Sequence, residues 1–125
     1  MKKNSLFIYH NIRCSKSRAV IKYLESKEIK FKTINYLNEP IDEKFLKKTL
    51  LVLEDDIQKV VRINEKTYKT KFKNKTPALS IDEINSLLKE YPILIQRPIA
   101  VIINNNNFVK STICRPPEKI QDFLI

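Results

Sequence analysis

The chain has 125 residues, of which 42% are hydrophobic and 30% charged, and its formal net charge is +10. This length and composition predict one globular domain, residues 1–125, that buries a core without disulfides or metal ions. All apolar runs are shorter than the roughly eighteen residues of a membrane span, and the complete absence of glycine excludes glycine-rich phosphate loops and dinucleotide-binding fingerprints.

The first third of the chain predicts a strand, a helix and a second strand. Residues 5–10 (SLFIYH) form a short apolar strand, whose apolar run is too short for a signal peptide, so a cytoplasmic protein is expected. Residues 31–36 (FKTINY) alternate large apolar with polar side chains, as strands do. A helix that begins near Ser15 has its apolar face at Val20, Ile21 and Leu24. This order is typical of a right-handed βαβ unit with parallel strands.

The middle of the chain predicts helices. A helix is expected to open at residues 40–42 (PID), and shorter helices are expected near residues 56–62 and 80–91. The stretch at residues 66–76 (KTYKTKFKNKT) has no clear hydrophobic period and is predicted to be exposed. We therefore expect a helical insertion at about residues 42–91.

The last third predicts two strands and a helix. Residues 97–103 (RPIAVII) and 108–113 (FVKSTI) flank a run of four asparagines. Asparagine tolerates left-handed turn angles, so this pattern predicts an antiparallel hairpin. Two consecutive prolines precede a final short helix, whose apolar face is expected at Ile120, Phe123 and Leu124. The whole order is that of a four-stranded α/β fold with a helical insertion between a βαβ half and a ββα half.

Cys14 follows the first strand directly, at the expected start of the first helix. Backbone N–H groups and the helix dipole favour an anion at this place, and they can lower the pKa of a cysteine below its free value of about 8.5. Arg13, Lys16, Arg18 and His10 are expected to add positive potential, and Ser17 stands where a second redox cysteine would be. The Cys-x-x-Ser pattern therefore predicts a reactive thiolate whose resolving thiol comes from another molecule.

The two cysteines also allow other interpretations. Most free cysteines are buried small hydrophobes, but the basic neighbours of Cys14 favour a reactive thiol. A Cys-x5-Arg phosphatase loop would need arginine at positions 20 or 120, which hold Val20 and Ile120. Two cysteines and one histidine are too few for a structural zinc site, and in a reducing cytosol Cys14 and Cys114 are expected to be free thiols.

A single basic residue predicts little about function, whereas the arrangement of several basic residues can indicate the kind of ligand. The lysines scatter along polar faces without the aromatic ladder of single-strand binders, so no nucleic-acid partner is expected. Arg97 precedes Pro98, a residue that belongs at a strand edge or turn and that accommodates a cis peptide bond, and Arg115 stands before the last helix. An arbitrary surface arginine contributes little, but arginines converging on a thiolate would bind a tetrahedral oxyanion bidentately.

The segments IYHN, C..SR, VVR, YPILIQRPI and ICRPPE, in this order, resemble the glutaredoxin-dependent arsenate reductase family over nearly the whole chain. The resemblance implies a thioredoxin-like, glutaredoxin-type fold with a mixed four-stranded sheet. It implies that Cys14 is the catalytic nucleophile and that three arginines bind the oxyanion: Arg62, Arg97 and Arg115. It also implies that Pro98 is a cis proline and that His10, Asn11 and Ser17 support the cysteine. No catalytic role for Cys114 comes with it.

The implied mechanism begins with attack of the Cys14 thiolate on arsenate. Glutathione is the implied co-substrate, and glutaredoxin resolves the mixed disulfide as arsenite leaves. The partners expected are therefore arsenate or a related oxyanion, glutathione and glutaredoxin, with no membrane. We expect no bound cofactor or metal ion and a monomeric protein.

The chain departs from the family pattern around the cysteine, at Ile12, Arg13, Ser15 and Lys16, where relatives often have proline, a small residue, glycine and threonine. Spx-type transcriptional regulators, which bind RNA polymerase, share the fold and an RPI segment and are the alternative function. They sense redox state through Cys-x-x-Cys, which Ser17 interrupts, and the ICRPPE segment favours the reductases. A family member with a different thiol substrate is the other alternative.

Overall fold

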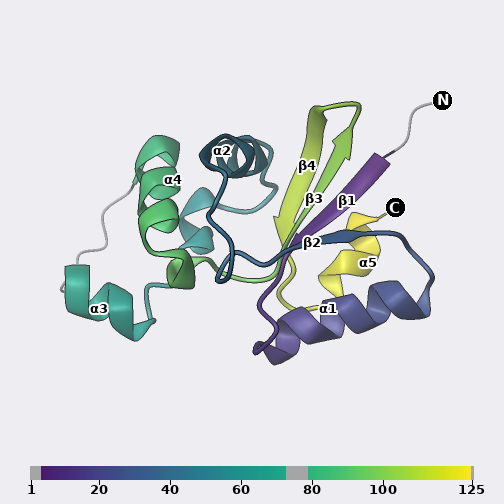
Figure 1. Cartoon of the computed structure of the whole chain (residues 1–125), viewed down its shortest axis with the longest axis horizontal. Coiled ribbons are helices and arrows are strands. Elements are labelled where there is room, and N and C mark those ends of the chain that lie inside the picture. The colour runs from purple at the N-terminus through teal and green to yellow at the C-terminus, as the bar shows by residue number, and fades with distance from the viewer. Residues whose placement is uncertain (1–3, 73–78, 125) are drawn as a thin grey trace.

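The computed structural model describes residues 4–72 and 79–124 (Figure 1). The sheet contains β1 (Asn4–Tyr9), β2 (Lys32–Ile34), β3 (Ile99–Asn104) and β4 (Asn107–Ile113). The helices outside the insertion are α1 (Ser15–Ser26) and α5 (Lys119–Phe123). The insertion between β2 and β3 comprises α2 (Glu43–Leu51), η1 (Ile57–Val60), α3 (Lys66–Phe72), α4 (Ile81–Glu90) and η2 (Pro92–Leu94).

The strand order is β2-β1-β3-β4, in which only the β1–β2 pair is parallel. A βαβ half therefore meets a ββα half along the β1–β3 pair, and the helical insertion connects the two halves. This confirms the predicted thioredoxin-like fold with its mixed four-stranded sheet. In the described part of the chain, no helix is both long and apolar enough to cross a membrane.

The central strand β3 is buried along almost its whole length because helices cover both faces of the sheet (Figure 1). Successive side chains of a strand point to opposite faces. Ala100 and Ile102 accordingly belong to a core with α1 and α5. Ile99 belongs to the larger core beneath the insertion, together with Tyr9 and Ile113. The insertion is thus packed onto the sheet through apolar side chains.

Capping residues explain where the insertion's helices begin. The Asp42 carboxylate accepts a 3.0 Å hydrogen bond from the Phe45 backbone N–H at the start of α2. Ser80 and Glu83 form a reciprocal capping box at the start of α4. Each arrangement satisfies N–H groups that have no partner inside the helix. The short helix expected near residues 56–62 is the single 3-10 turn η1.

The expectation that residues 66–76 are exposed holds for most of Lys66–Phe72, but these residues form α3, a helix that the sequence analysis did not predict. Tyr68 is buried, and its ring packs against Phe72, which in turn contacts Tyr91 at 6.0 Å between centroids. The ring of Tyr91 comes from a segment that is distant in the sequence. The lysine-rich stretch of α3 by itself therefore shows no apolar period. Residues 73–76 of that segment lie outside the described residues.

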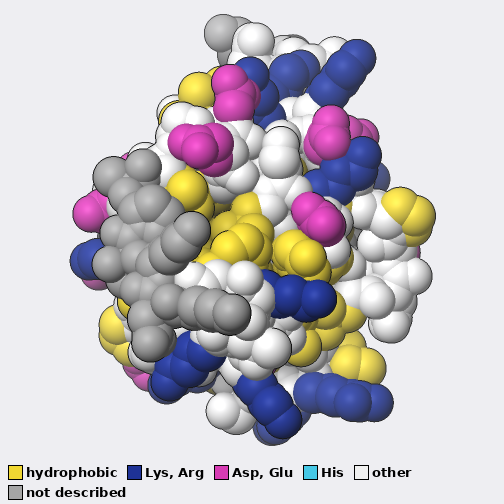
Figure 2. Space-filling model, turned by 90° about the vertical axis from the view of Figure 1, so that its left-hand side faces the viewer, with side chains coloured by type: hydrophobic (Ala, Val, Ile, Leu, Met, Phe, Trp, Pro, Cys, Tyr) yellow, Lys and Arg dark blue, Asp and Glu magenta, His cyan; other side chains and the backbone are white. Residues whose placement is uncertain are grey.

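The outer side of the insertion is hollowed between α3 and α4. The hollow has a volume of about 480 Å³, and its apolar lining includes Tyr68, Phe72, Leu79 and Leu87. Figure 2 faces this side of the molecule and shows hydrophobic side chains at its centre, among lysine, arginine and acidic side chains.

The asparagine run forms the predicted turn of the β3–β4 hairpin. Asn105 and Asn106 have φ values of 48° and 71°, in the left-handed region. Two consecutive residues with positive φ are typical of the type I′ turn, whose twist matches that of the flanking strands. Asparagine therefore takes the place that glycine usually has in such turns.

We predict that Asn106→Ala lowers the free energy of unfolding by about 1 kcal/mol, because alanine has no side-chain amide to offset the left-handed backbone. Urea denaturation of wild type and variant measures this loss. Asn107→Ala is the matched control, since Asn107 is an exposed residue of β4 with ordinary strand geometry. Equal losses in the two variants would contradict the turn assignment.

Candidate functional site

Cys14 occupies the N-cap position of α1, with φ −94° and ψ 121°. The first helical turn closes when the Arg18 N–H donates to the Cys14 carbonyl at 2.9 Å. Cys14 is only 8% exposed, yet it belongs to neither hydrophobic core. The expectation that basic neighbours would keep it from an apolar core therefore agrees with its position, although the residue itself is buried among polar groups.

The pKa of the Cys14 thiol is lowered from its ordinary value. Burial by itself raises this pKa, but the backbone N–H of Ser17 and the Arg97 guanidinium act in the opposite sense and outweigh it. The Lys16 N–H contributes further. The helix N-terminus and one arginine together therefore favour the thiolate, the form of cysteine that reacts as a nucleophile.

Arg97 has two buried nitrogens, Nε and Nη1, for which the described residues provide no hydrogen-bond partner. Leaving a buried donor unpaired costs about 1–3 kcal/mol, and more when the group is charged, so such groups are rare in native proteins. The Arg97 side chain also interacts with the Cys14 thiol, whose pKa it lowers. This arrangement suits a ligand that brings several acceptor atoms to the sulfur.

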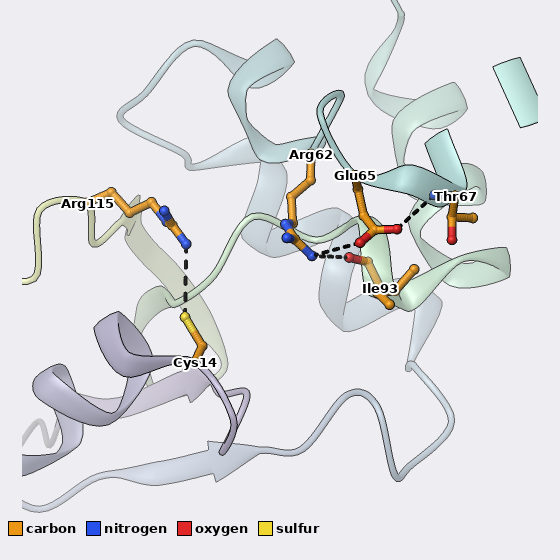
Figure 3. A network of polar contacts seen from close by, with 6 residues as sticks. All are labelled: Cys14, Arg62, Glu65, Thr67, Ile93 and Arg115. Atoms are coloured by element: carbon orange, nitrogen blue, oxygen red, sulfur yellow. Dashed lines mark hydrogen bonds and ion pairs between the residues drawn. The ribbon is translucent and has the colours of Figure 1, made fainter. Parts of the chain in front are cut away.

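Arg115 approaches the same sulfur from the segment after β4. Its Nη2 atom lies 3.9 Å from Cys14 Sγ, and Figure 3 shows the guanidinium pointing at the sulfur. Its Nε donates to the Arg97 carbonyl at 2.9 Å, which fixes the plane of the guanidinium. Arg97 and Arg115 are therefore brought together at Cys14.

Arg62 lies in the same region, but its guanidinium is turned toward the insertion (Figure 3). Its Nη1 donates to the Ile93 carbonyl at 3.0 Å and lies 3.8 Å from a Glu65 carboxylate oxygen. Burial lowers the pKa of Arg62, and the positive charges of Arg97 and Arg115 lower it further. The three arginines thus form one positive cluster, in which Arg62 is the member with a carboxylate neighbour.

The segments that carry the arginines are joined to one another by backbone hydrogen bonds. The Arg62 N–H donates to the Leu94 carbonyl at 2.8 Å, and the Gln96 N–H donates to Val60 at 2.7 Å. The Cys114 N–H donates to the Pro98 carbonyl at 2.8 Å. The Arg97–Pro98 peptide bond is cis, and so is Arg115–Pro116, for which the sequence analysis made no prediction.

His10, Asn11 and Ser17 form a small network next to the cysteine. The Ser17 hydroxyl lies 2.6 Å from His10 Nδ1 and accepts the Asn11 backbone N–H at 3.1 Å. Burial and the charge of Arg18 both lower the pKa of His10, so the imidazole is neutral at pH 7. These contacts hold the loop before α1. The expectation that His10 adds positive potential is wrong, because burial and Arg18 favour its neutral form.

Two residues near the site were missed by the sequence analysis. Tyr36 is buried, and its hydroxyl lies in the field of Arg97 and Arg62; burial nevertheless raises its pKa to about 12. Asp55 accepts hydrogen bonds from Thr112 Oγ1 (3.0 Å), the Ile113 N–H (2.8 Å) and Lys119 Nζ, and so holds the segment that precedes Arg115. No local pattern marks either residue, because their partners are distant in the sequence.

Among the described residues, no cluster of three or more His, Cys, Asp or Glu side chains is placed to hold a metal ion. The groups gathered at Cys14 are instead hydrogen-bond donors and cations. They can stabilise a thiolate and bind an anion with several oxygen atoms.

Comparisons with known proteins identify the family of the chain. The chain is 34% identical to the arsenate reductase of Haemophilus influenzae, over 96% of this chain and 99% of that protein. Its structure matches an arsenate reductase from Vibrio cholerae with a TM-score of 0.76 and 31% identity, covering 94% of this chain and 96% of that one. The global transcriptional regulator Spx of Enterococcus faecalis is 28% identical over 77% of this chain and 72% of that protein. The ArsC family model matches residues 9–123, and the chain therefore belongs to the ArsC family.

Proposed function

We propose that the protein is an arsenate reductase in which the Cys14 thiolate attacks arsenic(V) while arginines hold the arsenate oxygens. The observation that carries this proposal is an arginine, Arg97, that lowers the pKa of the Cys14 thiol and has two buried nitrogens without a partner among the described residues. A tetrahedral oxyanion supplies the acceptors that these donors lack, and guanidinium groups stabilise its charge. The names of the relatives from Haemophilus influenzae and Vibrio cholerae support the same substrate.

In the first step the Cys14 sulfur forms a bond to arsenic, and one arsenate oxygen leaves as water after taking up protons. No oxidation state changes in this step. Arg97 and Arg115 bind the remaining oxygens, since both guanidinium groups face the sulfur. Arg62 adds positive charge from the insertion.

The second step requires a thiol from outside the chain. Cys114 is fully buried in the core with α1 and α5, and burial raises its pKa to about 12. Ser17 holds the other position from which a cysteine could resolve the adduct. Glutathione as co-substrate and glutaredoxin as the reductant of the mixed disulfide meet this requirement without a bound cofactor, and the reducing cytoplasm is the compartment in which such thiols stay free.

The alternative is a regulator like Spx, or a family member that acts on a different thiol substrate. A Cys-x-x-Cys switch is not available at this position, because residue 17 is a serine, which cannot form a disulfide; its hydroxyl is hydrogen-bonded to His10 and Asn11 instead. The decisive experiment is arsenate-dependent oxidation of NADPH, coupled through glutathione, glutaredoxin and glutathione reductase. We expect turnover in wild type and Cys114→Ser and none in Cys14→Ser. Absence of turnover in the wild-type protein would reject the proposed activity.

We predict that iodoacetamide labels Cys14 but not Cys114 in the native protein. The pH dependence of the labelling rate should give a pKa for Cys14 below the ordinary value of a cysteine thiol. Because the pKa of Cys14 is lowered, its reactive thiolate forms at lower pH than that of an ordinary cysteine. Cys114 stays protonated, because burial raises its pKa, and the same burial keeps the reagent from its sulfur. Mass spectrometry of the labelled peptides over a pH series measures both. Labelling of Cys114 at a similar rate would contradict the assignment.

We predict that Arg97→Met raises the pKa of Cys14 and lowers kcat/KM for arsenate by about 100-fold or more, because a preorganised donor to the oxyanion is lost. Arg97→Lys keeps the charge but loses the planar pair of donors. It should therefore leave the thiol pKa near that of wild type while still lowering turnover. Equal turnover in wild type and Arg97→Met would show that Arg97 does not bind the substrate.

A further inference from the structure

A cavity of about 720 Å³ adjoins the arginine cluster on the side of the insertion. Arg62 and Arg115 line it, and we call it the arginine cleft. Cys14 does not line the cleft itself, but Arg115 connects the two, because its Nη2 atom lies 3.9 Å from Cys14 Sγ (Figure 3). The volume is within the roughly 300–1,000 Å³ of small-molecule sites.

The lining of the arginine cleft carries more positive than negative charge. Its cations are Lys59, Arg62, Arg115 and Lys119, and its carboxylates are Asp55 and Glu65. Both carboxylates are already engaged: Asp55 accepts from Lys119 and from the end of β4, and Glu65 accepts the Thr67 N–H at 2.8 Å and lies beside Arg62. Within the part of the chain that the structure describes, Lys59 and Arg115 have no carboxylate partner. The cleft therefore fits an anionic ligand.

A second cavity touches the loop before Cys14, but it is a poorer site for such a ligand. It measures about 250 Å³, and its lining includes Arg13, Asn11 and the neutral His10, with the apolar Ile12 and Leu37. Arg13 is the one full positive charge in that lining, against four in the arginine cleft. Size and charge both favour the arginine cleft.

We propose that the arginine cleft binds the carboxylates of a small anionic thiol and directs its sulfur to Cys14. This inference rests on the proposed function, which needs an outside thiol but does not say where the thiol binds. The thiol sulfur forms a bond to Cys14 Sγ as the Cys14–arsenic bond breaks. The electron pair of the broken bond stays on arsenic, which is thereby reduced from the +5 to the +3 state. Arsenic leaves as arsenite and takes up the proton of the thiol. A mixed disulfide between Cys14 and the small thiol remains.

Lys59 is the residue that tests this proposal, because it is exposed, lies in the cleft and takes no part in holding the oxyanion. The probes are glutathione and glutathione diethyl ester, which share a thiol but differ in their carboxylates. We expect Lys59→Met to raise the KM for glutathione about tenfold, the effect of losing about 1.4 kcal/mol of binding. The KM for the ester, the KM for arsenate and kcat at saturating glutathione should stay unchanged. Lys22→Met, at an exposed position on α1, is the charge-matched control and should change none of them.

A second readout does not depend on arsenate. Cys14 is converted to a mixed disulfide with a chromogenic aromatic thiol, and the release of that thiol by glutathione or by the ester is followed by absorbance. We expect glutathione to react faster than the ester in wild type and Lys22→Met, and this preference to be lost in Lys59→Met. Equal rates for glutathione and ester in wild type would overturn the proposal. If the preference is present without arsenate turnover, the thiol site stands and the proposed substrate fails.

Discussion

The cysteine site depends on holding a partly buried arginine, Arg97, beside Cys14. Two nitrogens of Arg97 have lost water without gaining a partner in the described residues, and a cation in that position is stable only if the surrounding chain is held in place. The holding contacts are backbone bonds, from Gln96 to Val60 and from Cys114 to Pro98, together with the bond from Arg115 Nε to the Arg97 carbonyl. Their combined effect is a preorganised set of donors, which need not rearrange when charge develops on a bound oxyanion.

The same side chain has opposite properties at the two cysteine positions. Cys14 is buried among N–H groups and a guanidinium, which lower its pKa, whereas Cys114 is buried among apolar side chains, which raise its pKa. Burial alone therefore does not decide cysteine reactivity; the polarity of the surrounding atoms does. With only one reactive thiol, the chain can begin a reduction but needs another molecule to complete it.

The helical insertion contributes to the site as well as to the core. It packs on the sheet around Ile99 and Ile113, and the segment after η1 carries Arg62 to the edge of the cysteine site. Asp55, between α2 and η1, joins the insertion to the end of β4 and to Lys119 in α5. The arginine cleft lies between these two parts of the fold, so its shape depends on the packing of the insertion.

The sequence by itself determined the strands, the first helix, the asparagine turn and the placement of Cys14 at a helix N-terminus, because these follow from local periodicity and backbone preference. It also supplied the three arginines, though only through resemblance to a family. Tertiary structure alone decided that Arg97 and Arg115 face the sulfur while Arg62 turns to Glu65, and that Tyr36 and Asp55 lie nearby. The bond from Asp55 to Ile113 and the ring contact that buries α3 join distant segments. Such contacts have no local signal, since they form only when the sheet and the insertion pack together.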